Sequence, residues 1–471
     1  MFLALSALGI LMLAVLLAAW LIVKTEWATE RVEARLGDAL GMQVKIAQPL
    51  QPGLFPGLNV TLADLELSTQ GQVVAVADRL SVRLATLSLL VGTVRPLELH
   101  IERPTLTFER YAPGVFNIFP GVPPGNGEPG TLDQLSLRHL RVSDARLTWL
   151  DQPSGFEWEF EHCDLAMRSI RHAGGLVEQA LATLATEGEL TCGSVSQEAF
   201  VATGLSAQIH AENGVIALED FSARVFEGRA SGRFETDLSS DTPRFNLQGT
   251  ISELELAALS AALTLEQSAS GKMNLELELD AGGTTWRKVR ETVAGTFSMG
   301  SDGLVLDGYD LDEELDNYAD TQRFNLVDIG AIFLGGPLGL AATRGYAFSG
   351  LLGGSDGSTA IDRVVSEWTV EGGVAQARDV AFRTGKNRLA LAGALDFVDY
   401  RFDDMRVAVV DRHGCAVVEQ KISGPFDEPE IERPNFLVSA AGPMLDLVKR
   451  GVQTITDSDC KIFYAGSITH P

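Results

Sequence analysis

The chain has 471 residues with 37 basic and 63 acidic side chains, which gives a formal net charge of −26. Because no local basic block offsets this charge, the chain would repel the phosphates of nucleic acid, and binding to nucleic acid is not expected. A hydrophobic content of 45% together with 47 glycines is typical of a folded, turn-rich protein and not of a disordered one.

The first segment, residues 1–23, contains no charged side chain. As a helix it would be about 35 Å long, which is enough to cross a hydrocarbon core of about 30 Å. A cleaved signal peptide is the alternative, but such a peptide has a basic start and a shorter apolar core. We therefore favour a retained transmembrane anchor. Charge encodes the orientation of the anchor only poorly. Lys24, Arg31 and Arg35 follow the span and, taken alone, would keep the body in the cytosol.

The next segment, from Thr25 to Gly41, is predicted to form a short amphipathic helix that Gly41 ends. Its apolar positions at helical spacing are Trp27, Val32, Leu36 and Leu40. From Met42 onward apolar and polar residues alternate with a period of two, as in strands that have one apolar and one polar face. The clearest runs are 79–84, 97–101, 105–109, 156–160 and 273–279. Since the pattern lacks long crossover helices, the sequence predicts a mainly β protein with antiparallel strands and a few short helices.

Residues 120–130 are dominated by proline and glycine and are predicted to be a linker. The linker would separate an N-terminal unit of residues 24–119 from a central β region of residues 131–300, which a C-terminal region of residues 301–471 follows. In that last region an acidic segment runs from Asp307 to Asp320, and its carboxylates at 310–316 are predicted to lie on a solvated helix. The segment Asn435 to Ile455 is predicted to be an amphipathic helix.

Patterns that resemble catalytic or metal-binding motifs lack the structural context that their chemistry needs. Gly125, Gly127 and Gly130 match a dinucleotide-binding pattern, but a strand-like segment follows where a helix is needed. Residues 353–357 match a nucleophile elbow without the strand-to-helix turn, and the carboxylates of 310–316 lack the glycine of a calcium loop. We therefore nominate no catalytic residue, metal ligand or cofactor, and expect that the protein is not an enzyme.

The four cysteines form two neighbouring pairs along the chain, Cys163 with Cys192 and Cys415 with Cys460. In an oxidising compartment each pair could form a disulfide that contributes about 2–4 kcal/mol. Four buried free thiols are the alternative, and four cysteines allow three pairings in all. If bridges form, the body of the protein lies outside the cytoplasm.

Several segments occur in the order seen in a known family. After the N-terminal span come residues 41–44 (GMQV), 54–58 (LFPGL), 76–82 (VADRLSV), 89–92 (LLVG), 102–106 (ERPTL) and 114–117 (GVFN). This order resembles the N-terminal region of the AsmA family of bacterial envelope proteins. Residues 295–297, 303, 307–311, 368–373, 393–396 and 424–429 resemble its C-terminal region.

The resemblance implies an inner-membrane anchor, a periplasmic body, and kinship with bridge-like lipid transfer proteins. In such proteins a strongly bent antiparallel β-sheet forms a trough with an apolar inner face. Period-two alternation alone favours the alternative in which the apolar faces pack against each other as a sandwich, and the resemblance reverses that preference. The apolar residues expected to line a lipid groove are Leu80, Val82, Leu84, Leu97, Leu99, Ile101, Leu275, Leu277 and Leu279.

The function implied by the resemblance is a membrane-anchored lipid-transfer protein that moves or holds phospholipid and so contributes to outer-membrane lipid homeostasis. Its expected partners are phospholipid, the inner membrane, and the outer membrane or envelope proteins. The alternative function is a membrane-anchored scaffold that affects outer-membrane protein assembly without lipid transport.

Overall fold

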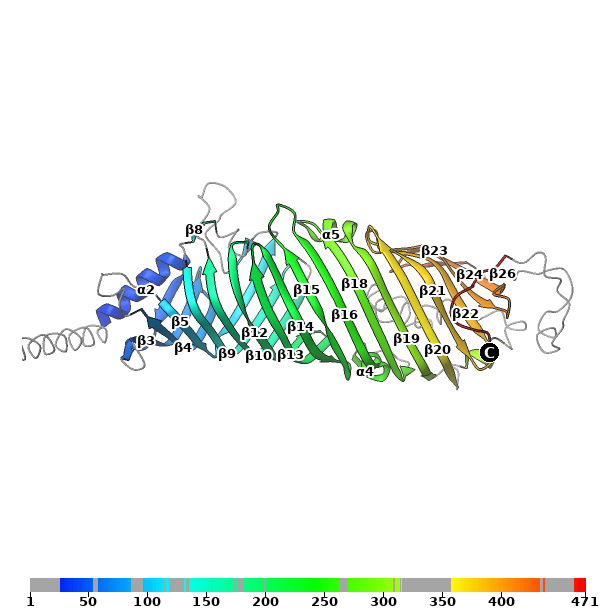
Figure 1. The fold of residues 1–471 in the computed structure, drawn as a ribbon, viewed down its shortest axis with the longest axis horizontal. Coiled ribbons are helices and arrows are strands. Elements are labelled where there is room, and N and C mark those ends of the chain that lie inside the picture. The colour runs from blue at the N-terminus through cyan, green and yellow to red at the C-terminus, as the bar shows by residue number, and fades with distance from the viewer. Residues whose placement is uncertain are drawn as a thin grey trace, which may run out of the picture. The chain divides into compact units, whose positions relative to one another are not determined.

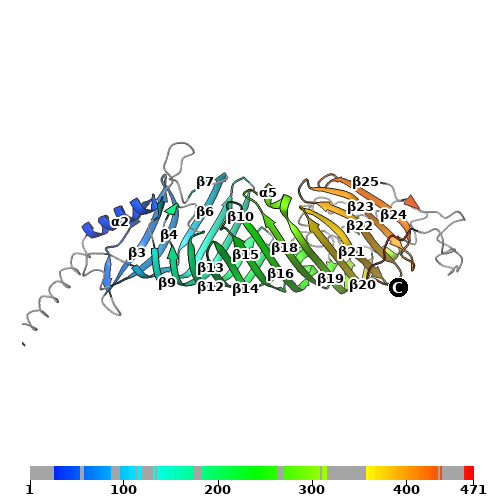
Figure 2. The ribbon, with the colours of Figure 1, turned by 45° about the horizontal axis from the view of Figure 1, so that its top comes forward.

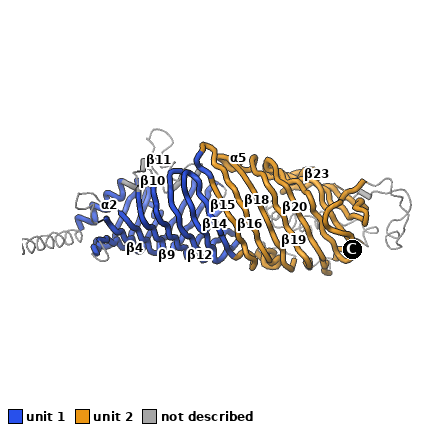
Figure 3. Tube along the Cα trace, viewed as in Figure 1, with its two compact units in different colours: residues 1–223, 237–239 blue, residues 224–236, 240–471 orange. Residues whose placement is uncertain are grey.

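A computed structural model of the protein describes residues 26–53, 58–85, 96–112, 115–117, 131–132, 135–153, 155–172, 175–176, 182–198, 200–262, 269–307, 310–313, 315, 357–432, 435–436 and 461–471. The chain forms two compact units, the first of residues 1–223 with 237–239 and the second of residues 224–236 with 240–471 (Figure 3). Both units consist mainly of β-strands with a few short helices, as the sequence predicts (Figure 1).

The strands that begin in the first unit are β1 (Gln43–Ile46), β2 (Gln51–Gly53), β3 (Asn59–Thr69), β4 (Gln72–Leu84), β5 (Pro96–Glu102), β6 (Thr105–Ala112), β7 (Val115–Phe116), β8 (Thr131–Leu132), β9 (Leu135–Asp151), β10 (Phe156–His172), β11 (Gly175–Leu176), β12 (Leu184–Gln197), β13 (Phe200–Glu212) and β14 (Val215–Val225). The alternating runs 79–84, 97–101, 105–109 and 156–160 all fall in these strands, which confirms those predictions. A two-residue Asn213–Gly214 turn joins β13 to β14, and both residues have the positive φ of a tight hairpin, 53° and 83°.

The sheet of the first unit is mixed, so the prediction of a mainly antiparallel sheet holds for most of its neighbouring strands but not for all of them. Most neighbours are antiparallel, but β5 and β6 follow one another along the same edge of β9 and run parallel to it. A parallel neighbour needs a long return connection, and the residues between β6 and β9 provide one. The predicted linker at 120–130 is within that connection and lies outside the described residues. Strands on both sides of it pair directly, and the predicted domain limits stay a prediction.

Helix α2 (Glu26–Leu40) matches the predicted amphipathic helix. It ends as expected at Gly41, whose φ is +65°, and the Met42 N–H donates to the Gly37 carbonyl at 3.2 Å, which closes the last turn. Among the predicted apolar positions, Val32 and Leu36 pack on the sheet, whereas Trp27 is 60% exposed and Leu40 is also exposed.

The strands that begin in the second unit are β15 (Gly228–Asp237), β16 (Arg244–Glu255), β17 (Ala269–Ser270), β18 (Lys272–Gly282), β19 (Ala294–Asp307), β20 (Ser358–Glu371), β21 (Val374–Thr384), β22 (Arg388–Asp396), β23 (Arg401–Val410), β24 (Ala416–Pro425), β25 (Glu430–Ile431) and β26 (Asn435–Phe436). They pair antiparallel in the ladders from β16 to β26. Two short helices, α4 (Leu256–Ala262) and α5 (Trp286–Thr292), interrupt them.

Side chains on one face of the second unit form a dense core. Trp368, 2% exposed, stacks on Phe297 with 5.7 Å between ring centroids, and its indole N–H donates to Ser366 Oγ at 2.7 Å. Phe382 and Leu389 in the same core are fully buried. The side chains of this part of the sheet are therefore buried as they are in the interior of a globular protein.

Two predictions for the C-terminal region differ in part from the structure, although residues 311–313 and 315 are helical as expected. Within the acidic segment, Leu311 is completely buried in the core, and Asp312 Oδ1 accepts hydrogen bonds from Thr384 Oγ1 at 2.7 Å and Asn387 Nδ2 at 2.6 Å. The described part of that segment is therefore docked on the fold and not simply solvated. The helix predicted from Asn435 is also wrong at its start, because residues 435–436 pair as strand β26 with β24, and 437–460 lie outside the described residues.

In the described part of the chain, no helix combines the length and apolarity that crossing a membrane requires. The predicted anchor, residues 1–23, lies outside that part.

Candidate functional site: an apolar sheet face

Apolar side chains in the first unit lie directly opposite one another from strand to strand. One row across β3, β4, β5, β9, β10, β12 and β13 is Leu62, Leu80, Ile101, Val142, Leu165, Leu190 and Ala207. The row beside it is Val60, Val82, Leu99, Leu140, Met167, Gly188 and Ile209. A third row, which passes through β6 in place of β5, is Leu67, Ala75, Leu106, Leu147, Phe160, Val195 and Ala202. We call these three rows the apolar face of the first unit.

The apolar face lies on one side of the sheet although the rows do not follow a strict period of two. Between the first and third rows each strand carries two consecutive residues that point to the other side, such as Ser143 and Asp144 on β9 or Glu161 and His162 on β10. The second residue of the pair has a left-handed backbone at Asp64, Arg103, Asp144, His162 and Gly204 (φ 53°, 48°, 54°, 52° and 62°). We call these positions aligned bulges. Each strand carries one extra residue, as in a β-bulge, but neighbouring strands carry it at the same level, so the β3–β4 and β12–β13 ladders keep their register through it.

The alignment of the bulges is the feature that the sequence analysis missed. A signal for it is present, because the apolar alternation skips from i to i+3 at the same level of each strand. Leu62 is followed by Leu65, Val142 by Ala145, and Phe160 by Cys163. A search for period two alone divides each such strand into two short runs.

Most side chains of the apolar face are only half-buried, including Leu80, Val82, Leu99, Ile101 and Leu140. The second unit differs, because Leu275 is 6% exposed and belongs to its core, where Leu277 and Leu279 are packed against it as partly buried neighbours. Leu84 and Leu97 lie on β4 and β5 of the first unit and are also half-buried. The residues expected to line a groove are thus divided between a half-exposed face and a filled core.

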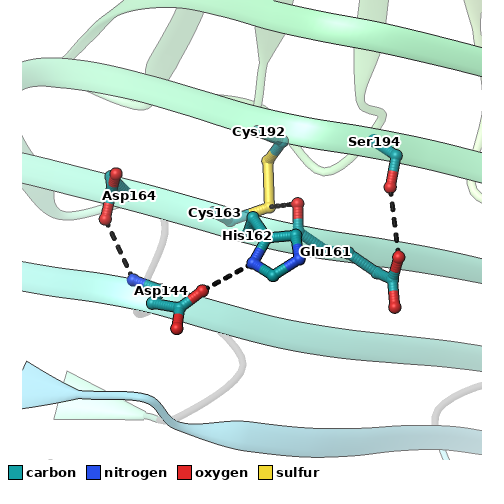
Figure 4. The surroundings of a disulfide bond; sticks show 7 residues. All are labelled: Asp144, Glu161, His162, Cys163, Asp164, Cys192 and Ser194. Atoms are coloured by element: carbon teal, nitrogen blue, oxygen red, sulfur yellow. Dashed lines mark hydrogen bonds and ion pairs between the residues drawn. A yellow bond between two sulfur atoms is a disulfide. The ribbon is translucent and has the colours of Figure 1, made fainter.

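A disulfide joins Cys163 of β10 to Cys192 of β12 at the level of the bulges, as the sequence pairing predicts (Figure 4). Both cysteines are buried, and they lie in register with Ala145 on β9 and Leu205 on β13, so the disulfide continues the apolar face. Cys415 is also disulfide-bonded, and Cys460, its expected partner, lies outside the described residues.

On the face of the sheet away from the apolar rows, charged side chains contact one another at the level of the bulges. Figure 4 shows Asp144 facing His162, with 2.7 Å between Oδ1 and Nδ1, while the Asp144 N–H donates to Asp164 Oδ1 at 2.9 Å. Arg103 Nε is 2.7 Å from Asp78 Oδ2 on the same side. The hydrogen bond from His162, with smaller contributions from the charges of His162, Arg146 and Arg103, lowers the pKa of Asp144.

Helix α2 covers one end of the apolar face. Ala28 is buried against Ile46, Leu50 and Leu62, with Val32, Leu36, Val60 and Leu80 packed around them. The Glu33 carboxylate accepts a hydrogen bond from the Ile46 N–H at 2.7 Å, which fixes the helix to β1. The two ribbon views agree that α2 lies beside β3 (Figures 1 and 2).

Aromatic side chains continue the apolar face beyond its third row. Phe108 of β6 stacks on Trp149 of β9 at 4.5 Å between ring centroids, and Trp158 of β10 meets Phe200 of β13 edge-on at 5.9 Å. Trp149 and Trp158 are themselves directly opposite in the β9–β10 ladder.

The described residues contain no group of three or more His, Cys, Asp or Glu side chains that could hold a metal ion. What this face of the sheet offers is apolar surface. A surface of this kind can cover hydrocarbon and so remove it from contact with water.

Comparison with known proteins gives one match. No curated protein and no solved structure is significantly similar to the chain. A model of the AsmA family matches residues 152–333, a range that begins at the β9–β10 turn and includes the disulfide and the strands that follow it. This match supports the assignment of the chain to the AsmA family.

Proposed function

We propose that the protein is a membrane-anchored, periplasmic lipid-transfer protein, without enzymatic activity, whose apolar face in the first unit shields the acyl chains of phospholipid. Residues 1–23 would hold it in the inner membrane. The general envelope role of the AsmA family agrees with this proposal.

The observation that carries the proposal is that most side chains of three apolar rows across β3 to β13 are only partly buried. In the second unit, by contrast, apolar side chains of β18 to β24 pack together in a buried core. A contiguous apolar surface that a protein's own side chains do not cover usually marks a binding site.

The energetic case for such a face follows from the size of the cargo. Carrying a two-chain phospholipid through water exposes about thirty methylenes at about 0.8 kcal/mol each, a barrier of about 25 kcal/mol. A face lined by Leu, Val, Ile and Phe removes most of that cost. The head group would remain in water, so the face needs no polar recognition residue, and the direction of movement would follow supply and removal of lipid at the two ends.

The direct test compares adjacent residues on the two sides of β9. A photo-reactive phenylalanine analogue replaces Leu147 on the apolar face or Thr148 on the other face, in the full chain in its native membrane. After irradiation we expect phospholipid adducts at position 147 and at least tenfold fewer at 148, measured by mass spectrometry. Equal labelling at both positions would contradict the proposal.

A second test uses charge. Val82 and Leu99 are directly opposite one another, and Val82→Asp with Leu99→Asp should abolish co-purified phospholipid. Thr107→Asp with Thr148→Asp places the same two charges opposite one another on the other face and should leave the lipid bound. Retention of lipid by the first pair would show that this face is not the path.

The scaffold function remains the alternative. It predicts that solvent extracts of the detergent-purified wild-type protein contain no stoichiometric phospholipid.

A further inference from the structure

The opposite, polar face of the first unit carries a hollow of about 710 Å³. It lies over β4, β5, β9, β10 and β12, where the side chains alternate to the side away from the apolar face. Its volume is within the range of small-molecule sites. Because the sheet separates the two faces, a ligand here is distinct from acyl chains on the apolar face.

The charged lining of the hollow reverses the balance of the whole chain. The chain has 37 basic and 63 acidic residues, whereas the hollow is lined by three arginines, two histidines and two glutamates. Glu98 is held by Arg83, with 2.9 Å between Oε2 and the guanidinium, and its other oxygen is 3.5 Å from His139 Nδ1. That carboxylate is therefore already neutralised within the protein.

Two of the arginines are available to a ligand. Arg141 is exposed and, among the described residues, makes no side-chain hydrogen bond or ion pair. Arg168, on the neighbouring strand, has only a long contact of 3.9 Å with Glu187, which lies outside the lining. Arg168 is opposite His139, two residues from Arg141 along β9, so the two guanidinium groups start from positions about 7–8 Å apart. Paired arginines of this kind suit the oxygens of a phosphate group.

The far side of the hollow carries the opposite charge. Ala166 lies between Arg141 on β9 and Glu189 on β12, in register with both, and its short side chain leaves the space between them open. Glu189 is exposed and, in the described part of the chain, has no ion-pair partner. The arrangement thus presents two cations and, across an alanine, one anion.

From this arrangement we infer that the hollow binds a zwitterionic phosphodiester, with its phosphate at Arg141 and Arg168 and a primary ammonium group at Glu189. The source of this ligand is a soluble head group or the surface of a bilayer that displays the same head group. The inference goes beyond the proposed function, because it uses the other face of the sheet and needs no acyl chain.

The test uses head groups without acyl chains, so that the apolar face is not probed. Glycerophosphoethanolamine and glycerophosphoglycerol are titrated into the full-length protein in detergent and followed by calorimetry. We expect binding of the first, weakened at least tenfold by Arg141→Gln with Arg168→Gln. Glu189→Gln should remove the preference for the amine-bearing compound while leaving glycerophosphoglycerol binding equal or tighter.

A matched control and a second assay separate the outcomes. Arg146→Gln removes an exposed arginine of β9 outside the hollow and should change neither affinity. The same variants are also assayed for flotation with phosphatidylethanolamine vesicles against phosphatidylcholine vesicles. Binding that appears only with vesicles and is lost in the double arginine variant supports the bilayer as the source. Absence of binding in both assays, or binding that the arginine variants leave unchanged, overturns the inference, whether or not lipid is found on the apolar face.

Discussion

Asp144 and His162 lie opposite one another on β9 and β10, both in left-handed backbone conformation and joined by a 2.7 Å contact between carboxylate and imidazole. Both residues belong to the line of bulges, so the contact joins the bulge of β9 to the bulge of β10. Because the hydrogen bond from His162 lowers the pKa of Asp144 from its ordinary value of 3.8, the contact has a defined dependence on pH.

The first prediction concerns acid. A carboxyl group whose pKa is lowered in the folded state stabilises the fold above its unfolded pKa and loses that contribution as the pH falls through its folded pKa. Asp144→Asn, which keeps a residue type that tolerates the left-handed conformation, should therefore flatten the loss of stability below about pH 4. Urea midpoints between pH 2 and 7 measure this. Asp220→Asn, at another left-handed position (φ 48°), is the control, and equal slopes in wild type and Asp144→Asn would contradict the prediction.

The second prediction concerns the disulfide between Cys163 and Cys192, which are 29 residues apart in sequence. Closing a loop of this length should stabilise the protein by about 3–4 kcal/mol through the unfolded state. Cys163→Ala with Cys192→Ala should lower the free energy of unfolding of the first unit by about that amount. Substitution is preferable to reductant, because reductant would also break the bond at Cys415. An unchanged denaturation midpoint would contradict the prediction, because it would show that the disulfide contributes no measurable stability.

The third prediction concerns Gly188 of β12, in the second row of the apolar face. A Cβ there would lie 2.4 Å from the Ala166 carbonyl oxygen and 3.0 Å from Met167 Cα, and both are backbone atoms that cannot easily move. Gly188→Ala should destabilise the protein by about 1–3 kcal/mol. Gly249→Ala on β16, where the nearest atom is 3.8 Å from the Cβ position, should be neutral or slightly stabilising. Similar melting temperatures for the two variants would be the contrary result.

The fourth prediction concerns the C-terminal segment 461–471 of the second unit. The buried Tyr464 hydroxyl donates to Asp379 Oδ1 at 2.5 Å and accepts from the Ile468 N–H at 3.0 Å, and the Arg388 guanidinium lies over its ring. Tyr464→Phe removes the donor to Asp379 Oδ1 and the acceptor of the Ile468 N–H, and should cost about 1–3 kcal/mol. Hydrogen exchange at Ser467 and Ile468 should accelerate. Tyr111→Phe, at an exposed position, is the control and should stay within about 0.5 kcal/mol of wild type.

Local patterns were sufficient to predict much of the fold. Helix α2 was predicted within one residue at each end, because its apolar spacing and Gly41 are both local signals. The alternating runs around Leu80, Leu99 and Leu277 predicted strands for the same reason. The parallel pairing of β5 and β6 with β9 could not be predicted, since parallel and antiparallel partners require the same alternation within a strand.

The candidate site was predictable only in part. The period of two identified apolar side chains but not what lies above them, so Leu80 and Leu275 could not be distinguished, although one is half-buried and the other is in a core. Burial depends on contacts between residues far apart in sequence, as for Leu311, which an acidic segment carries into the core. The polar hollow was likewise beyond sequence analysis, because Arg141, Arg168 and Glu189 meet only through strand register.

The aligned bulges restrict how this sequence can change in length. If β9 keeps its pairing with β6 and β10, deleting Asp144 alone would move every later residue of the strand by one position, and so to the other side of the sheet relative to its neighbours. Leu147 and Trp149 would then point to the charged side of the sheet, and Thr148 would point to the apolar side. Single-residue insertions and deletions in these strands should therefore be tolerated in the turns but not at the bend, where only a coordinated change in every strand would preserve the two sides.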